Sequence, residues 1–172
     1  MNGWLNCDLQ NTDVDVDLGC GKLPFKSNQF DAALSQHVIE HLWIHRELKP
    51  LLKEIRRVLK NEGELWLACP DIKKVCDSYA AAKCEDLVAA RQVRWPSYSL
   101  QGLPSSQFMN DIFHQSGQHK NLFDFELLQA VLVGEGFSDI EEVDENALLE
   151  RFNGFPARND DEQTLYVKAV KR

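Results

Sequence analysis

The stretch LKPLLKEIRRVLKNEGELWLAC, residues 48–69, predicts a helix, a turn and a buried strand in succession. Its apolar residues recur from Leu48 to Leu59 at the spacing of one helical face. The helix is expected to stop at Asn61-Glu62-Gly63, because glycine favours a helix end. Glu64–Cys69 then has the apolar composition of a buried strand, and Pro70 closes it. This stretch therefore predicts a helix that feeds directly into the core of a sheet.

Strand and helix patterns alternate on both sides of this stretch. Asp71 can cap a helix that begins at Ile72, and Asp124 can cap a second amphipathic helix that ends at Gly134. Such alternation predicts an α/β fold, one domain over residues 1–172, with a mostly parallel sheet flanked by helices. The last two strands could pair as an antiparallel edge. The further strands are expected at Trp4–Leu9, Asp13–Leu18, Phe30–Ser35, Ser138–Val143 and Thr164–Val170.

Residues 95–120 are rich in glycine, proline and serine and predict a long irregular loop. Long loops in compact domains are usually functional or disordered. The aromatic residues Trp95, Tyr98, Phe108 and Phe113 suit a small or mid-sized organic molecule. We expect this loop to act as a lid or substrate loop, although plain packing onto the sheet would use the same residues.

Composition narrows the possible partners. The 172 residues are 44% hydrophobic and 27% charged, which is typical of a globular domain rather than a disordered chain. The formal net charge of −8 argues against duplex nucleic acid and anionic membranes as main partners. No apolar run approaches the roughly 18 residues of a membrane span, and the first residues do not resemble a secretory signal. The five cysteines form no CxxC pair, so we expect reduced thiols in a cytoplasmic protein.

Two short motifs suggest other chemistry. Asp17–Gly21 has the glycines of a nucleotide loop, but residues 22–29 are too few for a parallel crossover, which needs about a dozen, so a turn is expected. His37–His41 matches H-x-x-E-H, a zinc-peptidase pattern that on a helix would place His37 and His41 on one face. His114, His119 or a carboxylate could supply a third ligand, but the pattern starts directly after a strand. We therefore predict no metal site and keep a zinc hydrolase as a minor alternative.

Two acidic residues stand at the carboxyl ends of predicted strands, Asp8 after the first and Asp17 near the end of the second. In open α/β sheets, ligands bind outside these ends of the strands. A carboxylate there can accept both hydroxyl groups of a ribose, whereas the same residues could also merely solubilise loop ends. The pair is a candidate ligand site.

Residues 23–42 (LPFKSNQFDAALSQHVIEHL) closely resemble class I S-adenosylmethionine-dependent methyltransferases of type 11. Residues 52–67 (LKEIRRVLKNEGELWL) are similar to the helix, turn and strand that follow in that family. Three later segments continue the resemblance in the family's order. They are Cys69-Pro70-Asp71, the run from His119 to Phe137, and Leu165–Lys171.

The resemblance implies a Rossmann-like methyltransferase fold with S-adenosylmethionine as the cofactor and a small or mid-sized organic methyl acceptor. Methyl transfer would be an in-line displacement on the sulfonium. His37 would be the base where the nucleophile carries a proton, with His41 or His114 behind it. The implied cofactor residues are Asp8 on the ribose, Leu9, Asp17 and Leu18 around the adenosine, and Gln36 with His37 near the sulfonium.

The glycine-rich loop and first strand of the family have no counterpart at the expected place in this sequence. The family's glycine-rich loop and first strand precede the position of Gly3-Trp4, so we expect an N-terminally incomplete sheet. The alternative is then a methyltransferase-like binding or assembly protein without catalysis. Exposed strand edges invite pairing with another chain, so we also expect self-association into a homo-oligomer.

Overall fold

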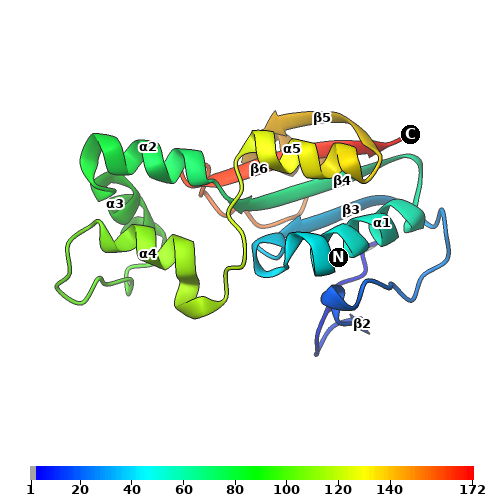
Figure 1. Ribbon diagram of the computed structural model, residues 1–172, viewed down its shortest axis with the longest axis horizontal. Helices are drawn as coiled ribbons and strands as arrows, with labels where there is room; N and C mark the ends of the chain where they lie inside the picture. The colour runs from blue at the N-terminus through cyan, green and yellow to red at the C-terminus, as the bar shows by residue number, and fades with distance from the viewer. Residues whose placement is uncertain (1–2) are drawn as a thin grey trace.

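The structure, a computed structural model, describes residues 3–172, and its main sheet has four strands in the order β3-β4-β6-β5 (Figure 1). These strands are β3 (Phe30–Gln36), β4 (Leu59–Pro70), β5 (Phe137–Val143) and β6 (Thr164–Lys171). A second, two-stranded sheet pairs β1 (Cys7–Asp8) with β2 (Val14–Asp15). The helices are α1 (Lys49–Val58), α2 (Ile72–Ala82), α3 (Glu85–Arg94), α4 (Gln107–His114), α5 (Phe125–Gly134) and α6 (Glu145–Arg151).

The direction of the strands matches the predicted α/β fold, with one refinement. β3 and β4 pair in parallel, with Leu34 opposite Trp66, whereas β6 runs antiparallel to both β4 and β5. Three of the four strands therefore point the same way, but the sheet is mixed because the reversed strand lies inside it. The predicted antiparallel pairing of the last two strands is confirmed.

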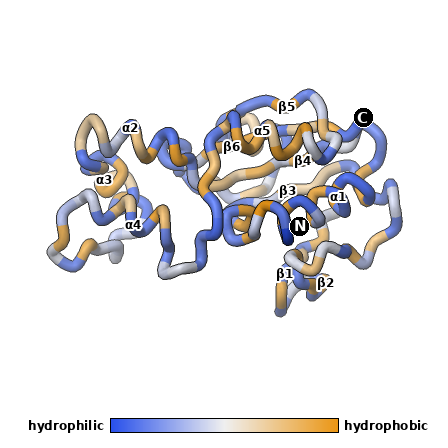
Figure 2. Tube along the Cα trace, viewed as in Figure 1, coloured by the Kyte–Doolittle hydropathy of each residue, from blue (hydrophilic) through white to orange (hydrophobic). Residues whose placement is uncertain are grey.

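The two faces of β4 build two separate parts of the core. Leu65 and Leu67 face α1 and α5, and this layer includes fully buried residues such as Leu52 and Leu128. Trp66 faces the opposite layer, where α6 and the N-terminal segment pack. Figure 2 shows the hydrophobic residues along these strands and again among α2, α3 and α4. The buried strand predicted at Glu64–Cys69 from its apolar composition is thus confirmed, although β4 starts earlier, directly after α1.

Helices α2, α3 and α4 form a group at one end of the sheet with its own hydrophobic cluster (Figure 1). Phe108 and Ile112 of α4 are buried against Leu87 of α3. The prediction of an irregular segment over residues 95–120 is therefore wrong in part, because α4 occupies its middle. Its apolar residues have helical spacing, but the flanking glycines and prolines conceal that pattern. Helices α3 and α6 were likewise not expected from the sequence.

The N-terminal segment differs most from the prediction. The expected strands Trp4–Leu9 and Asp13–Leu18 shrink to the two-residue strands β1 and β2, which lie outside the main sheet. Local hydrogen bonds explain this, since Asp13 accepts from the backbone of Asn6 at 2.9 Å and Asp15 accepts from Thr12 at 3.0 Å. Such side-chain bonds compete with sheet pairing. Within residues 3–172, no strand pairs with the outer edge of β3.

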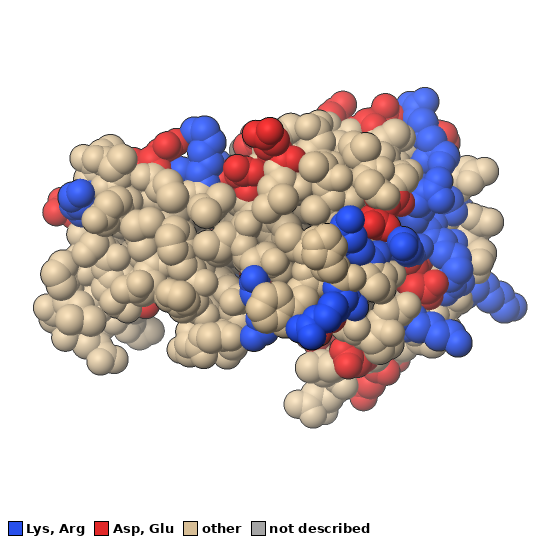
Figure 3. Space-filling view, in the orientation of Figure 1, with Lys and Arg blue, Asp and Glu red and all other residues tan. Residues whose placement is uncertain are grey.

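Charged side chains of the face shown in Figure 3 gather at the end of the molecule that carries the C-terminus. Basic groups in this region are paired with acids: Arg172 contacts Asp139 at 2.5 Å and Lys60 contacts Asp31 at 2.7 Å. In the part of the chain that the structure describes, no helix has the length and apolar character needed to cross a membrane.

Candidate functional site

The segment 36–41, directly after β3, lies between two cavities. Gln36, Val38 and Ile39 line a groove, whereas His37 and Glu40 line a second cavity. His37 adopts a positive φ of 54° and donates its backbone N–H to Ala68 at 2.8 Å. A positive φ is rare for a residue other than glycine and reverses the direction of the chain. This conformation turns successive side chains toward different cavities.

The groove has a volume of about 960 Å3 and follows the outer edge of β3. Leu51, Leu52 and Ile55 of α1 line it, as do Phe152 and Phe155 near α6. This volume is within the range of small-molecule and cofactor sites. The mainly apolar lining, with a few polar side chains near the ends of β1 and β3, is also typical of such sites.

The structure brings together some of the predicted cofactor residues. Asp8, Leu18 and Gln36 all line the groove. Leu9 is 66% exposed and lies outside the lining residues, and the carboxylate of Asp17 accepts the backbone N–H of Gly19 at 2.8 Å. Asp17 thus caps a short turn, as expected for the string Asp17–Gly21, rather than opening a nucleotide loop.

The second cavity has a volume of about 580 Å3 and lies between the carboxyl ends of β3 and β4 and the helical group. Arg91 dominates its far wall, with its guanidinium over the rings of Trp95, Tyr98 and Phe108 at 4.4–5.7 Å. Burial lowers the pKa of Arg91. Tyr98 donates to Asp111 at 2.6 Å, and burial together with this carboxylate raises the pKa of Tyr98 to about 12. Other residues lining the cavity are His37, Glu40, His41, His114, His119, Arg158 and Gln163.

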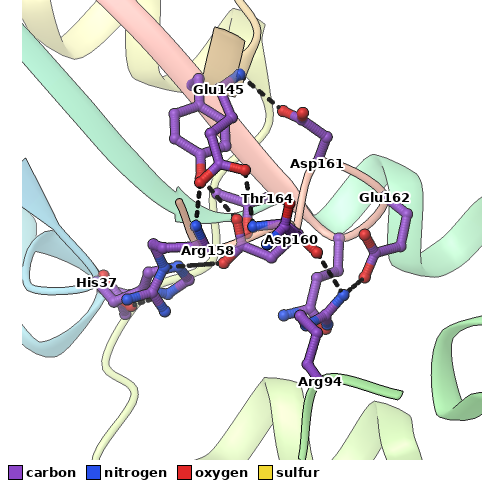
Figure 4. A network of polar contacts seen from close by, with 12 residues as sticks. His37, Arg94, Glu145, Arg158, Asp160, Asp161, Glu162 and Thr164 are labelled. Atoms are coloured by element: carbon purple, nitrogen blue, oxygen red, sulfur yellow. Dashed lines mark hydrogen bonds and ion pairs between the residues drawn. The ribbon is translucent and has the colours of Figure 1, made fainter. Parts of the chain in front are cut away.

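His37 lies between two buried carboxylates, that of Asp160, shown in Figure 4, and that of Glu40. Its Nε2 is 3.3 Å from Asp160 and its Nδ1 is 3.4 Å from Glu40. Burial disfavours the imidazolium, but the two carboxylates outweigh it and raise the pKa of His37. The helical H-x-x-E-H interpretation is wrong, because His37 has a positive φ and only Ile39–His41 forms a single 3-10 turn.

Asp160 is the centre of this polar network. It accepts hydrogen bonds from the Tyr166 hydroxyl at 2.6 Å and from Arg158 at 2.9 Å. Burial disfavours its ionisation, yet the contacts from His37, Tyr166 and Arg158 hold the pKa of Asp160 well below its ordinary value. Burial and the neighbouring carboxylate raise the pKa of Tyr166. Asp160 is therefore a carboxylate, and the group it faces in the cavity is His37.

The loop that carries Asp160 is held by a second buried carboxylate. Glu145 accepts the backbone N–H groups of Arg158 and of Asn159, the latter at 2.7 Å, while Asp161 accepts the backbone N–H of Glu145 at 2.9 Å (Figure 4). Neither Asp160 nor Glu145 is among the site residues predicted from the sequence. One signal was available: a final antiparallel strand must start at the edge where the parallel strands end, and the acidic run at 160–162 immediately precedes it.

The sequence and the fold of this chain are similar to those of known proteins. Residues 6–67 match the family model described as "Methyltransferase domain". No curated protein sequence matches the chain. A SAM-dependent methyltransferase from Archaeoglobus fulgidus has a similar structure, with a TM-score of 0.55 and 16% identity over 92% of this chain and 66% of that one.

Two further solved structures have lower scores. A possible histamine N-methyltransferase from Thermotoga maritima has a TM-score of 0.48 and 16% identity, covering 88% of this chain and 60% of that one. A methyltransferase structure from Bacillus halodurans has a TM-score of 0.49 and 15% identity, covering 97% of this chain and 80% of that one. The chain spans 40% and 60% of the first two solved structures it matches.

The family match covers the N-terminal segment, β3, α1 and much of β4, and the shared fold extends over the rest of the sheet. The predicted resemblance and the predicted Rossmann-like fold are both confirmed. Residues 6–67 are therefore similar to the type 11 methyltransferase domain, and the chain shares its fold with a solved S-adenosylmethionine-dependent methyltransferase.

Proposed function

We propose that this chain transfers a methyl group from S-adenosylmethionine to a small or mid-sized organic acceptor. The observation that carries the proposal is segment 36–41, whose successive residues line both the groove and the second cavity. A methyl transferase must hold donor and acceptor in one geometry, because most of its rate acceleration comes from positioning. Two cavities of about 960 and 580 Å3, on either side of this one segment, offer places for the donor and the acceptor.

The residues of the groove fit the proposed cofactor. The Asp8 carboxylate suits ribose hydroxyls, Leu18 and the apolar wall of α1 suit an adenine ring, and Gln36 offers an amide near the second cavity. Bound there, S-adenosylmethionine would supply an electrophilic methyl group. Leu9 and Asp17 remain part of the proposal as neighbours of these residues in the chain. Both carboxylates already accept a backbone N–H, Asp17 from Gly19 at 2.8 Å and Asp8 from Leu9 at 2.7 Å.

The second cavity is the proposed acceptor site, and the segment 95–120 forms much of its wall. His37 is the proposed base for a nucleophile that carries a proton. Both of its ring nitrogens contact carboxylates, so an acceptor would need to replace one of these contacts. The carboxylate that keeps its contact with His37, Asp160 or Glu40, would then hold the protonated imidazole in place.

Steady-state kinetics with a panel of hydroxyl and amine acceptors test this assignment through release of S-adenosylhomocysteine. We expect Asp8→Asn and Gln36→Ala to raise the KM for S-adenosylmethionine, and Trp95→Ala to raise the KM for the acceptor only. Asp77→Asn and Gln92→Ala, at exposed positions outside both cavities, are the matched controls. The proposal fails if groove and cavity variants change the same KM, or if a chain that binds the cofactor methylates no acceptor.

A second candidate, a binding or assembly protein with this fold, is favoured by the outer edge of β3. Its residues Phe30–Gln36 are apolar for the most part, and no strand pairs with that edge within residues 3–172. Such edges pair readily with strands of other chains. Self-association through this edge would appear as a dimer in size-exclusion chromatography with light scattering, and a monomer at all concentrations would contradict it.

A further inference from the structure

Glu40, His41 and His119 place one carboxylate and two imidazoles around a common point. Their ligand atoms lie within 4.8 Å of one another, and all three residues line the second cavity. The rings of His41 and His119 are 4.9 Å apart between centroids, at an interplanar angle of 63°. We propose that these three residues bind a divalent first-row transition-metal ion.

The carboxylate of Glu40 provides the strongest evidence. Its side chain is 1% exposed, and neither carboxylate oxygen has a hydrogen-bond partner within the described residues. Its nearest charged contact is Nδ1 of His37 at 3.4 Å. Burying an ionised carboxylate without hydrogen bonds is costly, so such groups are normally paired or coordinate metals. A cation beside Glu40 would provide that compensation.

The two histidines are oriented as metal ligands are. Nδ1 of His41 lies 3.3 Å from the carbonyl oxygen of Gln118, and Nδ1 of His119 contacts the carbonyl oxygen of Ile112. A carbonyl can only accept, so Nδ1 carries the proton and the lone pair is on Nε2. Metal-bound histidines characteristically donate their other N–H to such a carbonyl.

The backbone holds the three ligands together before any ion binds. The carbonyl oxygen of Glu40 accepts the backbone N–H groups of Lys120 at 2.8 Å and Asn121 at 3.1 Å. The side-chain amide of Asn121 donates to the carbonyl oxygen of Leu42. These bonds join the turn after β3 to the segment before α5, which brings His119 to Glu40. A site preorganised in this way does not require the ion to fold it.

The ligand set indicates which ion would bind. Two imidazoles with one carboxylate suit zinc in sites that keep an open position, and they suit other first-row divalent ions as well. The open positions would face the second cavity, where an oxygen or nitrogen atom of a bound molecule could reach the ion. Binding of the ion itself does not depend on the proposed methyl transfer.

Zn2+ and Co2+ are the probes for the test, used on chain freed of metal by a chelator. Calorimetry should give one Zn2+ per chain, and Zn2+ should raise the unfolding temperature. The Co2+ complex should show visible absorption of nitrogen and oxygen ligands without a thiolate charge-transfer band. A thiolate band would show instead that Co2+ had bound to the exposed thiols of Cys20 or Cys76.

Variants locate the ion. Loss of a group that only orients a metal ligand costs about 10–100-fold in affinity, so Glu40→Gln and His119→Gln should each weaken Zn2+ binding at least about tenfold. His45→Gln, at an exposed histidine nearby, should leave the affinity unchanged. Circular dichroism checks that each variant is folded. Absence of stoichiometric binding, or affinity unchanged in folded Glu40→Gln and His119→Gln proteins, would overturn the proposal.

Discussion

The substitution Asp160→Asn removes the charge at the centre of the polar network while keeping the size of the side chain. Asp160 is 2% exposed and receives the Tyr166 hydroxyl at 2.6 Å, Arg158 at 2.9 Å and His37 at 3.3 Å. An asparagine can still accept from Tyr166, but Arg158 and His37 lose their counter-charge. Removing one member of a buried charge cluster typically costs about 3–5 kcal/mol. Arg158 is 33% exposed and keeps contact with water, so we expect the lower limit, about 3 kcal/mol.

Thermal unfolding provides the assay. For a chain of this size, about 1 kcal/mol shifts the Tm by roughly 2–4 °C, so Asp160→Asn should lower the Tm by about 6–12 °C. Tyr166→Phe removes a single charge-assisted hydrogen bond and should cost about 1.5–3 kcal/mol. The matched control is Asp31→Asn, which breaks an ion pair of 2.7 Å between residues that are 82% and 47% exposed. Exposed pairs contribute about 0–1 kcal/mol.

The pH dependence of the Tm difference between wild type and Asp160→Asn gives an independent check of the role of Asp160. The folded-state pKa of Asp160 lies below its ordinary value of 3.8, so its stabilising contribution is complete above pH 3.8 and is lost as the pH falls toward the folded pKa. The difference between wild type and Asp160→Asn should therefore shrink below pH 3.8. It should also shrink as the pH rises through the raised pKa of His37, because a neutral imidazole loses its attraction to Asp160. A Tm difference as small as that of Asp31→Asn, or one that grows as the pH falls below 3.8, would refute the reasoning.

Two further substitutions test the helical group. Asp71→Ala removes the acceptor for the backbone N–H groups of Lys73 and Lys74 at the start of α2, at 2.8 and 3.2 Å. It should lower the free energy of unfolding, measured in denaturant, by about 1 kcal/mol. An unchanged unfolding midpoint would contradict the capping role of Asp71. Phe108→Ala empties a fully buried position in α4 and should cost about 3–5 kcal/mol. Hydrogen exchange should then quicken in α2, α3 and α4, and protection equal to the wild type would show that residues 95–120 do not pack as described.

The elements predicted from the sequence are those whose apolar periodicity is strong. Leu51, Leu52 and Ile55 mark α1, and Leu65 to Cys69 mark β4, because both elements bury a full face in the core. Helix α4 was not predicted, because its two buried residues, Phe108 and Ile112, stand among glycines, prolines and serines. The strands expected at the N-terminus shrank because Asp13 and Asp15 bond to nearby groups, which a period-two pattern does not reveal.

The residues of the candidate site could likewise be predicted from the sequence only in part. Asp8, Leu18 and Gln36 reach one groove as the order of the strands leads one to expect. The partners of His37 could not be predicted in the same way, because Asp160 lies far along the chain and meets His37 only through the antiparallel β6. His119 was one of several possible third ligands in the sequence. The hydrogen bonds that attach its segment to Glu40 single it out.

Titration of this 172-residue chain with S-adenosylmethionine and S-adenosylhomocysteine in a calorimeter tests the central claim most directly. We expect binding of both at micromolar concentration, about −8 kcal/mol, with weaker binding in Asp8→Asn and unchanged binding in Asp77→Asn. A chain shown to be folded that releases or absorbs no heat with either compound, at millimolar concentration, would contradict the proposed cofactor site in the groove along β3.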